Sequence, residues 1–120
     1  MKCILLNSAM MPKEGTYRLM KISLSEFKFI LRYFYKKGQL EPYIGYQQNI
    51  DLIEKWTGIK LPLVREEVTG LEDGDILLIM KLKYRLKDPS LKGVHIADEE
   101  DFEFYVATYS DEVPDKIPLI

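Results

Sequence analysis

A run of five apolar residues at positions 76–80, Ile-Leu-Leu-Ile-Met, constrains the fold of this chain more than any other feature. A strand that is apolar at every position is covered on both faces, so it belongs inside a layered structure. A turn pattern at residues 72–75 precedes this run, and residues 3–6 form a second, similar run. Both runs are far shorter than the roughly 20 residues that cross a bilayer. The sequence therefore predicts two central strands and no membrane-spanning segment.

The segments around these runs predict an α/β fold. Residues 16–22 alternate as a strand does, and Ser23 with Glu26 forms a capping-box pattern ahead of an apolar stripe at helical spacing. A second helix is expected from residues 45–47 to Gly58, followed by extended segments at 63–68, 76–85 and 102–109. We predict a single α/β domain over residues 1–110 with a mixed sheet of about five strands, flanking helices and a tail at 111–120.

Composition limits the chemistry of the chain. Its 120 residues form about one small domain, and one cysteine with one histidine excludes an internal disulfide and a cysteine zinc site. Residues 1–92 hold 16 Lys and Arg against 11 Asp and Glu (net +5), and residues 93–120 hold 1 against 8 (net −7). This balance favours a small polyanion in a local pocket and does not favour double-stranded DNA. The acidic residues 98–101 are interpreted as a solvated surface.

A glycine before the second predicted helix is the first candidate for a binding site. Open amides and the helix dipole at a helix N-terminus bind phosphate, so we assign Gly45, Gln47 and Asn49 to a candidate ligand-binding turn. The alternative is that Gly45 only makes a turn.

Polar residues at strand ends are further candidates. Arg65 and Arg85 lie on or at the end of predicted strands, and two guanidinium groups bind phosphate oxygens in a bidentate manner. The alternative is pairing with nearby carboxylates such as Glu66. Asn7 and Ser8 follow the first strand, where α/β sheets gather ligand loops, although a capping role fits equally well. We interpret His95 as a surface residue and Cys3 as an inert core thiol.

Several weak motifs occur in an order and spacing that is more specific than any one of them. They are Leu6-Asn7-Ser8-Ala9, Ile44-Gly45 with Ile50, Gly58 with Pro62 and Arg65, Gly74-Asp75, and Lys81-Leu82-Lys83-Tyr84-Arg85-Leu86. Over residues 3–88 this set resembles the viral ring nucleases, or type III anti-CRISPR proteins, a family of archaeal viruses and phages.

The resemblance implies a function and a partner. It implies a homodimer whose pocket lies across the two-fold axis and binds cyclic tetra-adenylate, the second messenger of type III CRISPR systems. It implies a cut without metal or cofactor, in which a ribose 2′-hydroxyl attacks the adjacent phosphate and leaves a 2′,3′-cyclic phosphate. It further implies action in the cytoplasm of the host cell, with no membrane partner.

Three positions depart from the family pattern. The family's general-acid histidine, directly after Ile-Gly, is Tyr46, and a free histidine titrates near pH 6.5 whereas a free phenol titrates near 10. Loss of a positioned acid costs about 10²–10⁴ in rate. The family's threonine is Asn49, and its glutamate after the arginine is Asp88, unless an insertion at 89–92 displaces that loop.

Three hypotheses therefore stay open at the level of sequence. The first is a slow nuclease in which Arg65 and Arg85 stabilise the phosphorane charge, Asp88 takes the place of the glutamate, and Tyr46 donates a hydrogen bond. The second is a module that binds the cyclic nucleotide without cutting it. The third is a dimeric scaffold reused for protein interaction.

Overall fold

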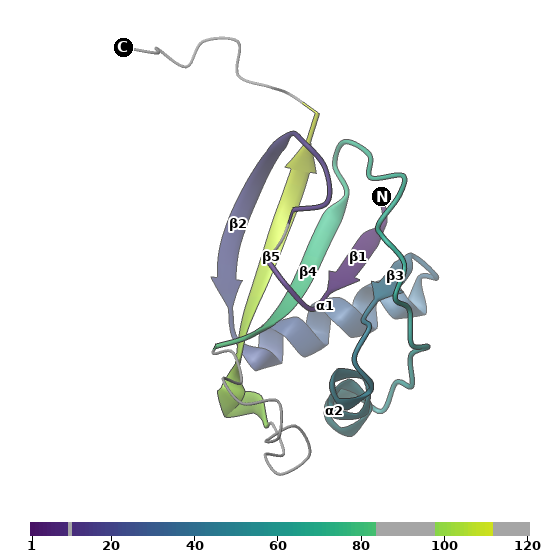
Figure 1. Cartoon of the computed structure of the whole chain (residues 1–120), viewed down its shortest axis with the longest axis vertical. Coiled ribbons are helices and arrows are strands. Elements are labelled where there is room, and N and C mark those ends of the chain that lie inside the picture. The colour runs from purple at the N-terminus through teal and green to yellow at the C-terminus, as the bar shows by residue number, and fades with distance from the viewer. Residues whose placement is uncertain (10, 84–97, 112–120) are drawn as a thin grey trace.

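The computed structural model describes residues 1–9, 11–83 and 98–111. They form one mixed five-stranded sheet with two α-helices and a short 3₁₀-helix (Figure 1). The strand order is β2-β5-β4-β1-β3. The element bounds are β1 Cys3–Leu6, β2 Thr16–Ile22, α1 Leu24–Lys36, β3 Leu40–Tyr43, α2 Gln47–Thr57, β4 Ile76–Leu82, η2 Glu99–Asp101 and β5 Phe102–Ser110. The predicted α/β class and the mixed sheet of about five strands are confirmed.

Strand β1 lies between two parallel partners. Cys3 pairs with Leu40 of β3 and with Ile76 of β4, and this register continues to the end of β1 at Leu6. All four side chains of β1 are buried. Strands β2 and β5 extend the sheet beyond β4 in antiparallel pairing. The carboxyl ends of β1, β3 and β4 therefore meet at one edge of the sheet.

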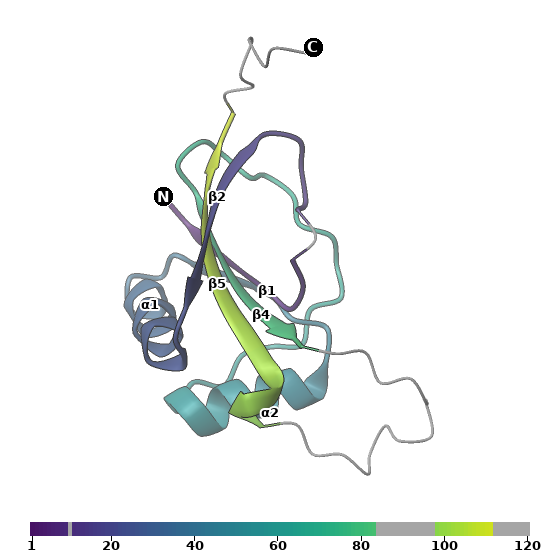
Figure 2. The same ribbon diagram turned by 90° about the vertical axis from the view of Figure 1, so that its left-hand side faces the viewer.

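Helix α1 covers one face of the sheet, as the side view shows (Figure 2). Its buried residues Phe27, Leu31 and Phe34 carry the stripe that the sequence predicted. The capping box is also confirmed, because Ser23 Oγ accepts from the amide of Glu26 and the Glu26 carboxylate accepts from the amide of Ser23. This arrangement satisfies two helix-end donors that otherwise lack partners.

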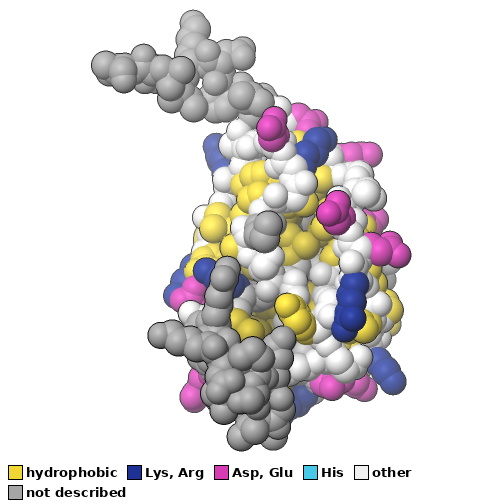
Figure 3. Space-filling model, in the orientation of Figure 1, with side chains coloured by type: hydrophobic (Ala, Val, Ile, Leu, Met, Phe, Trp, Pro, Cys, Tyr) yellow, Lys and Arg dark blue, Asp and Glu magenta, His cyan; other side chains and the backbone are white. Residues whose placement is uncertain are grey.

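The opposite face of the sheet is covered by irregular segments. Leu77, Ile79 and Tyr109 form a buried cluster there with Leu71, which comes from the chain between α2 and β4. Yellow apolar side chains gather over the middle of this face in Figure 3. The Tyr109 hydroxyl donates to the carbonyl of Glu14 (3.1 Å), which attaches the segment before β2 to the end of β5. The central strand is thus covered on both faces, as predicted.

Two sequence-based predictions of strands were wrong. The sequence analysis predicted no strand at residues 40–43, but they form β3. Proline is tolerated there because β3 is an edge strand. Residues 63–68 were expected to be a strand, but they contain none. The residues expected to continue β4 past Lys83 lie outside the described part of the chain.

Asp75 connects the turn before β4 to the start of β1. Its side chain is buried, and its two carboxyl oxygens accept from the amides of Lys2 (3.1 Å) and Glu72 (2.8 Å). The carbonyl of Asp75 accepts from the amide of Tyr109 (2.9 Å), so the same residue also holds β5. One residue therefore holds the start of β1, the turn before β4 and the end of β5.

We expect Asp75→Ala to lower the free energy of unfolding by about 2–4 kcal/mol, because two partly buried amides lose a charged acceptor. Urea denaturation followed by circular dichroism measures this loss. Glu66→Ala, at an exposed position, is the matched control and is expected to change stability by less than about 0.5 kcal/mol. Equal stability of both variants would contradict the role assigned to Asp75.

Candidate functional site

The glycine turn lies at the edge where the parallel strands end. Strand β3 ends at Tyr43 beside Leu6 of β1, and the chain then passes through buried Ile44 and Gly45 into α2. Tyr46 is the N-cap residue and has extended backbone angles (φ −118°, ψ 122°). Its carbonyl accepts from the amides of Asn49 (3.1 Å) and Ile50 (3.3 Å), but its side chain does not cap the helix. The predicted helix start and the stop at left-handed Gly58 (φ 78°) are confirmed.

Arg65 packs against this turn. Its Nε donates to the carbonyl of Gly45 (3.1 Å), and the amide of the preceding Val64 donates to the carbonyl of Ile44 (3.0 Å). A Cβ atom at position 45 would lie 3.2 Å from Arg65 Cγ, so glycine permits the close approach. Among the described residues Arg65 forms no ion pair, and the residue is exposed. The fold thus places a guanidinium group without a carboxylate partner in the described ranges beside a helix N-terminus, an arrangement that suits an anion.

The remaining predicted residues around the turn differ in their surroundings. Asn7 and Ser8 follow β1 at the same edge and are half-buried. Gln47 is exposed, and its amide donates to Asp51 (2.9 Å) one turn along α2. Asn49 is only 3% exposed, so its side chain lies within the fold. The structure therefore brings Asn7, Ser8, Gly45 and Arg65 to one edge and leaves Asn49 below the surface.

Three predicted residues fall outside the described ranges. They are Arg85, Asp88 and His95. The chain leaves β4 through Lys83, whose amide donates to the carbonyl of Asp101 (2.9 Å). It returns at Asp98, which pairs with Lys55 of α2 (3.9 Å).

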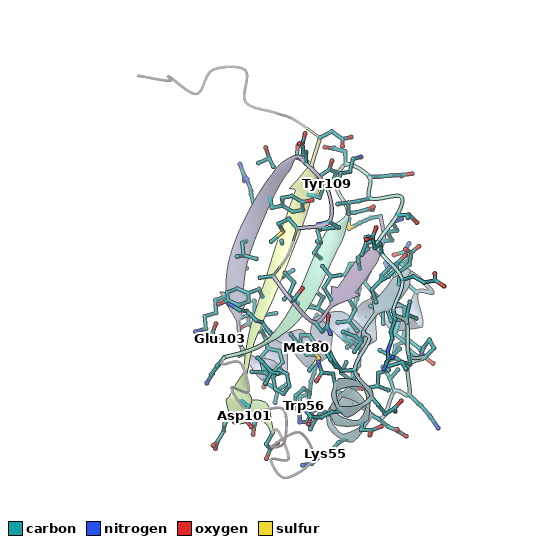
Figure 4. The ribbon with its side chains drawn as sticks, in the orientation of Figure 1. Lys55, Trp56, Met80, Asp101, Glu103 and Tyr109 are labelled. Carbon is teal, nitrogen blue, oxygen red and sulfur yellow. The ribbon has the colours of Figure 1, made fainter. Side chains whose placement is uncertain are left out.

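A hollow of about 270 Å³ lies farther along the same edge of the sheet, between the start of α1 and η2. The sequence analysis missed it, because its lining comes from four separate segments that share no motif. Figure 4 shows Asp101 and Glu103 at this end of β5 and Tyr109 at the other. The charged residues that line the hollow are Lys21, Lys83, Glu99, Glu100 and Glu103. This mixture of charges does not concentrate the positive potential that a phosphate ligand requires.

The carboxylate of Glu103 has partners of its own at this hollow. The hydroxyl of Tyr105 donates to it (2.6 Å), and Lys21 lies 3.8 Å away. The Tyr105 hydrogen bond is the main cause that lowers the pKa of Glu103, and the same bond raises the pKa of Tyr105. Both groups are thereby engaged with each other.

No group of three His, Cys, Asp or Glu side chains in residues 1–9, 11–83 and 98–111 is arranged to hold a metal ion. Within the same ranges, no helix combines the length and the apolar character that a bilayer crossing requires.

The fold and this edge together define a small mixed α/β domain with a candidate anion-binding turn. The chain belongs to the STIV B116-like family, whose model matches residues 3–106. A solved structure with a similar fold is B116 of Sulfolobus turreted icosahedral virus, with a TM-score of 0.72 and 23% sequence identity. The match covers 90% of this chain and 99% of that one. A search of curated proteins found no match. Similarity to an archaeal virus protein agrees with the viral family that the sequence resembled.

The single cysteine provides a test of the core at the start of β1. Cys3 is fully buried in β1, and burial raises the pKa of its thiol to about 12. At pH 8 the thiol is therefore neutral and shielded, and we expect it to react with a disulfide reagent at least 100-fold more slowly in the native protein than in urea. Fast labelling of the native protein at pH 8 would contradict the burial of β1.

Proposed function

We propose that this protein is a viral ring nuclease-like protein that binds cyclic tetra-adenylate as a homodimer and counters type III CRISPR signalling. Membership of a family named after an archaeal virus protein supports the viral part of this proposal. The resemblance over residues 3–88 supports the ligand, because it includes the glycine turn and the arginine that packs on it.

The observation that carries the proposal is the contact between Arg65 and Gly45 at the start of α2. A helix N-terminus carries about half a positive charge, and the adjacent guanidinium adds a full one. Two copies related by a two-fold axis double this set of charges, which suits a cyclic ligand with four phosphates. The proposed pocket therefore needs both subunits, each contributing one turn and one Arg65.

The proposed reaction uses no metal. The 2′-oxygen of one ribose forms a bond to the adjacent phosphorus and loses its proton to solvent. The bond from phosphorus to the 5′-oxygen breaks, and that oxygen takes up a proton. Position 46, where the family has histidine, is occupied by an exposed tyrosine at the start of α2. We propose slow cleavage, because loss of the positioned acid lowers the rate by about 10²–10⁴ while the phosphate-binding groups remain.

The central experiment incubates the purified protein with labelled cyclic tetra-adenylate in the presence of a chelator, and follows retention and product. Retention with slow formation of a 2′,3′-cyclic phosphate supports the proposal. Retention without product reduces the function to binding. The absence of both contradicts the proposal and favours a scaffold that binds another protein. Light scattering of the same sample measures whether the protein is a dimer.

Arg65→Ala is expected to weaken retention of cyclic tetra-adenylate by about 10- to 150-fold, because a charged hydrogen-bond donor to phosphate is lost. Arg18→Ala, at an exposed position on β2 at the opposite end of the strand order, is the matched control and is expected to have no effect above threefold at physiological salt. Equal losses in both variants would indicate nonspecific attraction of charge rather than a site.

Tyr46→His is expected to raise the rate of cleavage at neutral pH by at least tenfold, since it restores an acid that titrates in this range. Tyr35→His, a half-exposed position on α1, is the control and is expected to leave the rate unchanged. Single-turnover assays with both variants give the comparison. A Tyr46→His variant that retains the ligand without a gain in rate would show that the reacting groups are not aligned with position 46.

A further inference from the structure

The ring of Tyr46 is an unused aromatic surface beside the candidate anion site. It is 59% exposed, and neither its ring nor its hydroxyl has a partner among the described residues. We infer that Tyr46 is a stacking platform for a purine base of the bound nucleotide, so that the ring face and not the hydroxyl contributes to affinity. This inference rests on the proposed function and adds a specificity-determining residue to the same site.

The backbone around Tyr46 is fixed before any ligand arrives. Its carbonyl is the acceptor for two amides of the first turn of α2, and Ile44, two residues earlier, is fully buried. The carbonyl of Gly45 is held by Arg65 from the other side. Anchors on both sides of position 46 fix its backbone, so binding of a ligand has to order only the side chain at this position.

The other tyrosines with defined contacts differ from Tyr46. Tyr17 packs on Tyr109 (5.2 Å between ring centroids), and Lys37 lies over the ring of Tyr33 (4.6 Å). Tyr105 donates its hydroxyl to Glu103. Each of these side chains already has a partner within the fold. Tyr46 has none in the described ranges, and it is the tyrosine that directly follows the residue bound by Arg65.

An exposed ring that directly follows the residue bound by a guanidinium suits one class of ligand. Single-stranded nucleotides present a charged phosphate and a flat base close together, and proteins commonly bind them with a cation and a stacked aromatic side chain. A tyrosine is well suited to stacking, whereas the proton donor expected at this position in the family is a histidine. The substitution therefore changes position 46 from a reacting group to a base-binding group.

The test compares three variants in equilibrium binding of cyclic tetra-adenylate. Tyr46→Leu removes the aromatic face and is expected to weaken binding by about 5- to 150-fold. Tyr46→Phe keeps the face and loses the hydroxyl, so its affinity is expected to stay within threefold of that of the unmodified protein. Tyr35→Leu, a similarly exposed tyrosine on α1, is the matched control and is expected to bind normally.

A second readout distinguishes stacking from loss of structure. A cyclic tetranucleotide that carries 2-aminopurine in place of one adenine is expected to lose fluorescence when it binds the unmodified protein and the Phe variant. At saturating protein, the Leu variant is expected to retain more of that fluorescence. Circular dichroism of the variants confirms that each is folded.

The outcomes separate this inference from the proposed function. If the unmodified protein binds the ligand and Tyr46→Leu binds equally well, the stacking role is wrong and the proposed function stands. If Tyr46→Phe loses as much affinity as Tyr46→Leu, the hydroxyl carries the contact and the inference is overturned. If the unmodified protein retains no cyclic tetra-adenylate, the proposed function fails and the inference fails with it.

Discussion

The parallel pairing of β1 with both β3 and β4 is the constraint on which the rest of the structure depends. The four residues of β1 are buried between these two partners, and in the register that they adopt β1 and β3 end together while β4 continues in the same direction to Leu82. That common edge determines where the chain re-emerges after β3, and hence where α2 begins. This pairing brings Gly45 and Asn7 to the same edge of the sheet, although 37 residues separate them in the sequence.

Local signals explain which elements were predictable from the sequence. The capping box of Ser23, the stripe of α1 and the left-handed Gly58 act within a few residues of one another, so they specify both helices. The apolar runs of β1 and β4 are equally local. Strand β3 has no such signal, since Pro42 opposes strand formation and the strand depends on its pairing with β1. Residues 63–68 have a strand-like composition, but β1 already has a partner on each side and offers no edge for them.

The candidate site shows the same division between local and tertiary information. The sequence indicated Gly45 by its place before a helix, and the structure confirms that place. Arg65 was selected as the end of a strand that does not exist, yet it reaches the turn because the backbone of Val64 pairs with that of Ile44. No spacing rule predicts a contact between residues 20 positions apart in an irregular segment. The burial of Asn49 could not be predicted from the sequence either, because its neighbours on the inner side of α2 come from the rest of the fold.

In the proposed function, binding of phosphate and cleavage depend on different atoms at this edge, and that separation explains how a change at position 46 lowers the rate of cleavage and preserves the binding of phosphate. The proposed attraction for phosphate comes from backbone amides, the dipole of α2 and the guanidinium of Arg65, none of which involves the side chain at position 46. Proton transfer to a leaving oxygen, by contrast, depends on the position and the acidity of that side chain. An exposed aromatic residue at the N-cap is compatible with the fold, because the first turn of α2 is held by its backbone and not by a side-chain cap. The backbone around position 46 is therefore held independently of the side chain at that position.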